Sequence, residues 1–91
     1  MRQRFFMFVQ CKPGKTYEVG QAILAKKLEY IADISSISGK WDLLLRIEID
    51  SRKDVAREIV GPISEVQGIK RTKTIVAYEV YNPDDVYFEE D

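Results

Sequence analysis

The residues best suited to chemistry lie in segment 37–45, where Gly39, Trp41 and Asp42 separate two apolar runs. A glycine at the first central position suits a type II′ turn, because positive φ angles cost glycine little. The segment therefore predicts a two-residue hairpin turn at Gly39 and Lys40. Asp42 needs hydrogen-bond donors, since an unpaired carboxylate is costly to bury. Those donors are either the amides of the turn or the ammonium group of a ligand, so both interpretations of Asp42 stay open.

Catalytic chemistry is disfavoured by the composition, because the chain contains no histidine. The usual base at neutral pH, histidine metal ligands and the Cys-His and Ser-His pairs of nucleophilic enzymes are therefore absent. The carboxylates that remain show no paired spacing typical of a general acid and base; they are Asp33, Asp42, Glu48 and Asp50. We expect neither an enzyme nor a bound metal or cofactor.

Two basic motifs fail as phosphate-binding sites. Gly14 and Lys15 resemble the end of a nucleotide-binding loop, but that motif requires a glycine where Val9 stands. A second basic cluster lies at the start of the last predicted strand: Lys70, Arg71 and Lys73. Sheet-based RNA-binding modules display aromatic residues within a Lys/Arg-Gly-Phe-like segment, which this sequence lacks. These bases are therefore interpreted as a solvated strand edge.

With 91 residues, 45% of them hydrophobic, the chain is expected to form one small domain. Its formal net charge of −1 conceals an acidic tail, residues 82–91, which holds five of the 15 acidic residues and no base. Residues 1–81 are left with ten acids against 14 bases, a mildly basic balance of +4. The single cysteine, Cys11, lies in an apolar run and is expected to pack as a small hydrophobe. No apolar run approaches the roughly 18 residues of a membrane helix, so we expect a cytoplasmic protein.

Hydrophobic periodicity predicts four strands and two helices. The strands are expected at residues 2–12, 31–38, 41–49 and 69–81, and the first helix at residues 15–28. The second helix is expected to begin near Ser51, with Asp54 completing a capping box, and to kink at Gly61 and Pro62. This order is that of an α+β, ferredoxin-like βαββαβ domain, a four-stranded antiparallel sheet with both helices on one face. The domain is expected to span residues 1–81.

The first predicted strand is apolar on both of its faces. Phe6 and Phe8 are expected to project away from the helices, and an exposed apolar patch of this kind favours association. The simplest closed arrangement is a two-fold dimer with the open sheet faces together. Its expected interface residues are Phe6, Phe8, Leu44, Val76 and Tyr78.

Three segments resemble the effector-binding domain of the Lrp/AsnC family, often called the RAM domain; they are residues 9–15 (VQCKPGK), 31–45 (IADISSISGKWDLLL) and 67–74 (QGIKRTKT). The resemblance implies a ferredoxin-like domain that dimerises through its sheet and assembles further into larger oligomers. It also implies that small effectors, usually amino acids, bind between dimers near the Gly-x-x-Asp turn. The ligand-binding residues expected here, partly from the chemistry of the turn, are Ser38, Gly39, Lys40, Trp41, Asp42 and Thr74.

The resemblance leaves out the family's N-terminal helix-turn-helix, so we expect a stand-alone module that does not bind nucleic acid directly. Its expected function is to sense a small molecule, most simply an amino acid, and to form a homodimer or higher oligomer. The alternative is a ligand-free assembly partner that co-oligomerises with full-length regulators. A small dimeric barrel enzyme of similar topology is disfavoured by the lack of histidine.

Overall fold

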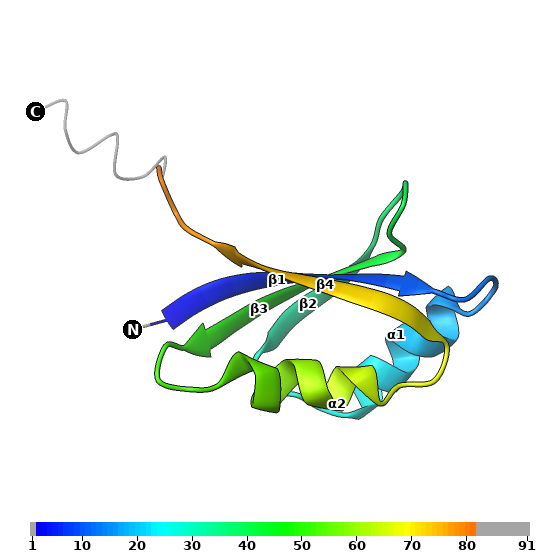
Figure 1. The fold of residues 1–91 in the computed structure, drawn as a ribbon, viewed down its shortest axis with the longest axis horizontal. Helices are drawn as coiled ribbons and strands as arrows, with labels where there is room; N and C mark the ends of the chain where they lie inside the picture. Colours follow the sequence, from blue (N-terminus) through cyan, green and yellow to red (C-terminus); the bar gives the residue numbers. More distant parts are fainter. Residues whose placement is uncertain (1, 82–91) are drawn as a thin grey trace, which may run out of the picture.

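The computed structural model describes residues 2–81, which form a four-stranded sheet with the helical segments on one face (Figure 1). In chain order the elements are β1 (Arg2–Cys11), α1 (Thr16–Ala25), β2 (Ile31–Ser36), β3 (Leu43–Asp50), the π-helix η1 (Ala56–Val60), α2 (Gly61–Ser64) and β4 (Ile69–Ala77). The strands lie in the order β2-β3-β1-β4, and all neighbours are antiparallel. The ferredoxin-like α+β prediction is confirmed, whereas the predicted tail, 82–91, lies outside the described residues.

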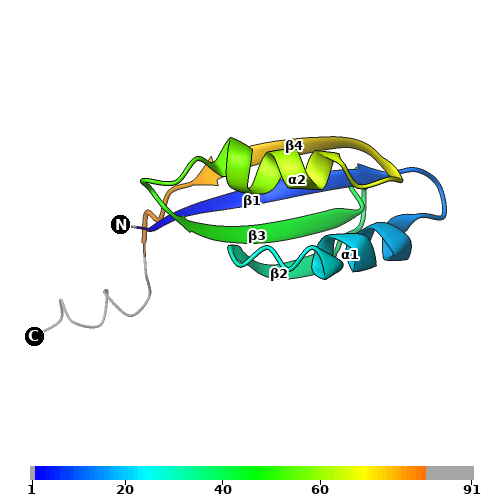
Figure 2. The ribbon, with the colours of Figure 1, turned by 90° about the horizontal axis from the view of Figure 1, so that it is seen from below.

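The hydrophobic core lies between the sheet and the helices, with α1 on the β2 side and α2 on the β1 and β4 side (Figure 2). Successive side chains of a strand point to opposite faces, so every second residue of the central strands β1 and β3 reaches this core. These buried residues are Phe5, Met7, Val9, Cys11, Leu43, Leu45, Ile47 and Ile49. Val19 and Ile23 of α1 pack against them, together with Ile59 and Ile63. The prediction that Cys11 packs as a small hydrophobe is confirmed.

The second helical segment differs in detail from its prediction. Asp54 caps it alone, because its Oδ1 accepts a hydrogen bond from the Ala56 N–H at 3.0 Å, and no Ser51 contact completes a capping box. The predicted disturbance at Gly61 and Pro62 is confirmed: the Gly61 N–H donates to the Ala56 carbonyl five residues back, as in a π-helix. Proline has no N–H to continue an α-helical ladder, which accounts for the change of helix type at this point. Across residues 2–81, no helix has the length and apolar character needed to cross a membrane.

The hairpin between β2 and β3 is wider than predicted. Ser36 pairs with Leu43, and the Ile37 N–H donates to the Asp42 carbonyl at 2.9 Å, so the loop contains the four residues 38–41. The prediction of a two-residue turn was wrong. Gly39 does adopt a positive φ of 105°, as predicted, but within this longer loop. The Asp42 N–H also donates to the Val9 carbonyl of β1 at 2.9 Å, which ties the base of the loop to the central strand.

The register of β4 shows that two of the five residues predicted for the open face do not lie there. Val76 lies opposite Phe5, on the helix side, and Ile75 instead lies opposite Phe6 on the open face. Tyr78 follows the end of β4 and is 79% exposed, so it is not part of the sheet surface. The cause is a bulge: Gln10 pairs with Arg71 but Cys11 pairs with Ile69, so one extra β4 residue reverses the alternation that follows. Three predicted members do lie on the open face and are half-buried there: Phe6, Phe8 and Leu44.

Candidate functional site

The loop of residues 38–41 is fastened to β1 by the aspartate that follows it. The Cys11 N–H donates to Asp42 Oδ2 at 2.7 Å, and the Asp42 N–H donates to the Val9 carbonyl. A carboxylate that accepts from a backbone N–H forms a charge-assisted hydrogen bond, which is stronger than a neutral one. Asp42 therefore orders the turn, as one interpretation of the sequence required, while its Oδ1 has no hydrogen-bond donor within residues 2–81.

Cys11 lies directly beside this carboxylate. Burial of the thiol raises its pKa above the ordinary value, and the negative charge of Asp42 raises it further. Both effects disfavour the thiolate, which is the nucleophilic and metal-binding form of cysteine. The residues that the structure describes also contain no cluster of three carboxylate, cysteine or histidine side chains able to hold a metal ion. The chemistry available at this site is therefore hydrogen bonding and charge pairing.

The tip of the loop is open to solvent and carries unused backbone donors. Apart from Gly39 itself and its two chain neighbours, no heavy atom of the described residues lies within 4 Å of the position that a Cβ of residue 39 would occupy. Within residues 2–81, the backbone N–H groups of residues 38–41 have no hydrogen-bond acceptor. Amides exposed in this way are suited to binding an anionic oxygen, because each presents a partial positive charge. A ligand carboxylate can reach them without meeting a side chain at Gly39.

Trp41 packs on the open face of the sheet beside Phe8, with the ring centroids 5.9 Å apart and the planes at 47°. Two cations approach the same indole: the Arg71 guanidinium carbon lies 5.1 Å from the ring centroid and Lys40 Nζ lies 6.0 Å from it. Gln10 joins these groups. Its Nε2 donates to the Lys40 carbonyl at 3.1 Å, and its Oε1 accepts from Arg71 Nε at 2.9 Å.

Gln10 and Arg71 belong to this site although sequence reasoning did not select them. The sequence pattern indicated only that Arg71 belongs to a solvated strand edge. Gln10 and Arg71 come together because they pair across β1 and β4, although they lie 61 positions apart in the chain. No local pattern predicts that contact.

Thr74 is not brought to the loop. It lies opposite Met7 in the middle of β4, on the helix-facing side of the sheet, whereas Trp41 packs with Phe8 on the open side. The structure therefore brings five of the six predicted ligand-binding residues together: Ser38, Gly39, Lys40, Trp41 and Asp42.

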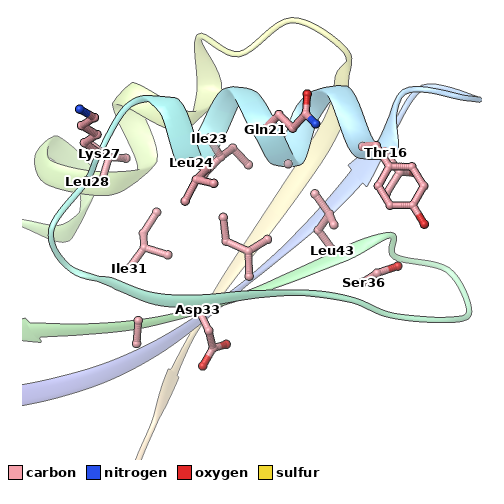
Figure 3. Close-up of a pocket in the computed structure, with 14 residues that line it drawn as sticks. Thr16, Gln21, Ile23, Leu24, Lys27, Leu28, Ile31, Asp33, Ser36 and Leu43 are labelled. Atoms are coloured by element: carbon pink, nitrogen blue, oxygen red, sulfur yellow. The ribbon is translucent and has the colours of Figure 1, made fainter.

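A groove of about 440 Å³ separates α1 from the edge strand β2 (Figure 3), and sequence reasoning missed it. Its floor and walls are largely apolar, formed by Ile23, Leu24, Leu28 and Ile31 among others. Asp33 lies at its border, but Figure 3 shows its carboxylate pointing away from the groove, where it accepts from Arg46 Nε at 2.8 Å. The groove thus offers mainly apolar contact, and its one lining carboxylate is turned away from it.

A smaller groove of about 360 Å³ lies at the opposite end of the sheet, between Arg2, Arg4 and the residues around Tyr78. Glu48 partly neutralises this end, since its Oε1 lies 3.7 Å from Arg2 Nη1. Neither groove contains a residue of the 38–42 segment.

The sequence matches the family model described as "Lrp/AsnC ligand binding domain" over residues 4–87. The chain belongs to the Lrp/AsnC family. An uncharacterised HTH-type transcriptional regulator of Pyrococcus abyssi is 28% identical to it over 53 residues, which are 58% of this chain and 35% of that protein. The chain therefore spans about a third of the length of the curated relatives that it matches.

Solved structures share the fold of this Lrp/AsnC domain. TTHA0845 of Thermus thermophilus superposes with a TM-score of 0.76 at 21% identity, covering 88% of this chain and 98% of that one. A hypothetical protein of Pyrococcus horikoshii superposes with a TM-score of 0.70 at 26% identity, covering 89% and 94%. A transcriptional regulator of Neisseria meningitidis, solved as a complex with L-Met, gives a TM-score of 0.69 at 14% identity, covering 88% of this chain and 52% of that one.

Proposed function

We propose that this Lrp/AsnC domain senses an amino acid at the loop of residues 38–42 and couples its binding to self-assembly. The observation that carries the proposal is the match of residues 4–87 to a ligand-binding domain. The structure of the Neisseria meningitidis regulator with L-Met supports an amino acid as the class of effector, because that regulator has the same fold. The role is regulatory, in keeping with the family, and needs no catalytic group.

The geometry of the loop supports an amino acid as its ligand. An amino acid presents a carboxylate and an ammonium group a few ångströms apart, so its site needs donors for one and an acceptor for the other. The backbone N–H groups of residues 38–41 are the donors, and Gly39 leaves the approach to them open. Asp42 Oδ1 is the acceptor, since Oδ2 already holds the Cys11 N–H.

Self-assembly through the open sheet face is the second part of the proposal. Phe6, Phe8 and Leu44 lie together on this face, which no other element of residues 2–81 covers, and Ile75 is 38% exposed beside them. A two-fold dimer that places two such faces together buries both patches at once. The 38–42 loop lies at the end of this face, since Trp41 packs against Phe8, so a ligand at the loop lies close to the dimer contact.

One observation favours a second function. Asp42 already stabilises the turn through Cys11, so its presence does not require a ligand. Without an effector, the domain would act as an assembly partner that co-oligomerises with full-length regulators of the same family. The two functions differ in a single measurable property, the binding of an amino acid.

A thermal-shift screen of the 91-residue chain against the twenty amino acids tests the proposal. A ligand at 100 times its Kd stabilises the native state by about 2.7 kcal/mol, which raises the melting temperature clearly. We expect at least one amino acid to do so and to lose this effect in Asp42→Asn, which keeps the side-chain shape but removes the charge that holds an ammonium group. If no amino acid shifts the melting temperature and the chain still self-associates, the assembly-partner function replaces the sensing one.

A further inference from the structure

The two cations above Trp41, Lys40 and Arg71, have no carboxylate partner within the described range 2–81. Among residues 2–81, the ion pairs involve other basic side chains, and neither Lys40 nor Arg71 lies within 4.0 Å of a carboxylate. Both cations lie close to the centroid of the Trp41 ring, Lys40 Nζ at 6.0 Å and the Arg71 guanidinium carbon at 5.1 Å. The two cations are therefore at most 11.1 Å apart. The loop thus combines free N–H donors with two unpaired cations and one carboxylate.

A neutral amino acid bound at the loop leaves two cations without an anionic partner. Its carboxylate binds the loop amides and its ammonium binds Asp42 Oδ1, so Lys40 and Arg71 remain without an anionic partner. An apolar side chain placed on Trp41 competes with both cations for the same ring, which Phe8 also contacts. A basic side chain is repelled by the two cations. A second carboxylate on the effector's side chain satisfies all of these groups at once.

We infer that the effector of this domain is an acidic amino acid, one that carries a second carboxylate on its side chain, and that Lys40 and Arg71 select it. The guanidinium of Arg71 is held in place for this role, because Gln10 Oε1 accepts from its Nε at 2.9 Å. Its two terminal nitrogens are left for a carboxylate, which a guanidinium binds as a planar fork. Lys40 adds a point charge from the loop itself. This inference rests on the proposed function and names the class of ligand.

Calorimetry with two matched pairs of ligands tests the inference on the 91-residue chain. Aspartate and asparagine are nearly equal in size and differ by one charge, as are glutamate and glutamine. We expect one acid to bind at least tenfold more tightly than its amide at low ionic strength. The preference should shrink at high salt, because the Debye length falls to about 3 Å at 1 M.

Three variants that each remove one positive charge test which residues cause the preference for the acid over its amide. Lys40→Gln and Arg71→Gln should each reduce the ratio of acid to amide affinity by several-fold. Lys40→Gln is the sharper test, because Lys40 is exposed and, unlike Arg71, its side chain donates no hydrogen bond to another residue of the range 2–81. Lys53→Gln is the matched control, since Lys53 is exposed in the turn after β3 and forms no ion pair with residues 2–81. The ratio of acid to amide affinity in Lys53→Gln should equal that of the wild type.

The outcomes separate the inference from the proposed function. If a neutral amino acid binds as tightly as the acids or more tightly, the sensing function stands and the acidic specificity is wrong. The same conclusion follows if the acids are preferred but Lys40→Gln and Arg71→Gln leave the ratio unchanged. If none of the twenty amino acids binds, the sensing function fails and the inference fails with it.

Discussion

The two faces of the sheet are built from the same strands, yet they bury their side chains to different extents. On the helix side, Met7, Leu45 and Ile47 have no exposed surface. On the open side, Phe8 and Leu44 are only half-buried, and Arg46 lies among them in ion pairs with Asp33 at 2.8 Å and Glu48 at 2.5 Å. Buried apolar surface stabilises the fold, whereas half-exposed aromatic groups beside fixed charges are typical of surfaces that bind partners. The covered face thus holds the chain together, and the open face is available for assembly.

The largest effect on the free energy of unfolding is expected from substitutions on the covered face of the sheet. Two neighbouring residues, one on each face, test this. Leu45→Ala should lower the free energy of unfolding by about 2–5 kcal/mol, because it leaves a cavity in a fully packed core. Leu44→Ala, one residue away on the open face, should cost about 1 kcal/mol or less of fold stability. Urea denaturation of both variants, followed by circular dichroism, measures the difference. Equal losses would mean that the two faces contribute alike to the fold, which contradicts the comparison.

A charge on the open face gives the next effect. Phe8→Glu should convert the proposed dimer into a monomer or into aggregates, because the interface would have to bury an unpaired carboxylate. Sedimentation velocity at micromolar concentration, where the wild type is expected to be dimeric, measures the change. Ser51→Glu is the control, since Ser51 is exposed in the turn after β3 and away from the sheet face. A monomeric wild type would show that the open face is not an interface.

Asp42 lies at the base of the 38–41 loop, directly before β3, and its removal should have a smaller effect. Asp42→Ala deletes the charged hydrogen bond to the Cys11 N–H, which corresponds to about 1.5–3 kcal/mol. We expect the fold and the dimer to persist while effector binding or higher-order assembly is lost. Calorimetry with the best ligand of the thermal-shift screen, together with sedimentation, measures both. Unchanged affinity and assembly would reduce Asp42 to a turn residue.

The smallest effect concerns an exposed charge at the end of β3. Hydrogen bonds from the Arg52 side chain and backbone lower the pKa of Asp50 from 3.8 to about 2. The folded protein therefore binds this proton less readily than the unfolded chain does, so the stabilisation is complete above about pH 4 and is lost as the pH falls towards 2. In Asp50→Asn the loss of stability between pH 4 and 2 should be slightly shallower than in the wild type. Thermal melts across that range test this, and identical pH profiles would contradict it.

The sequence determined the order of the elements and the covered face of β3. In β3 apolar residues alternate with Arg46, Glu48 and Asp50, and a period of two residues leaves only one way to place them against the helices. The strand β1 is apolar on both faces, and its pairing with β3 places Phe5 and Met7 on the same covered side. Glycine and proline likewise marked the helix irregularity at Gly61 and Pro62, because their effect on the backbone is local. The chemistry of Asp42 was also readable, since a carboxylate beside a turn must find donors.

Tertiary structure decided the rest, because it depends on contacts between residues far apart in the chain. One extra residue in β4 moved Val76 to the helix side and Ile75 to the open side, and such a bulge is set by pairing with β1 rather than by the composition of β4. The pairing between β2 and β3 set the hairpin loop at the four residues 38–41 in place of the predicted two-residue turn. The same sheet brought Arg71 and Gln10 to Trp41 and carried Thr74 to the other face. Local patterns fix which way a single strand faces, whereas the register between strands fixes which side chains meet at a site.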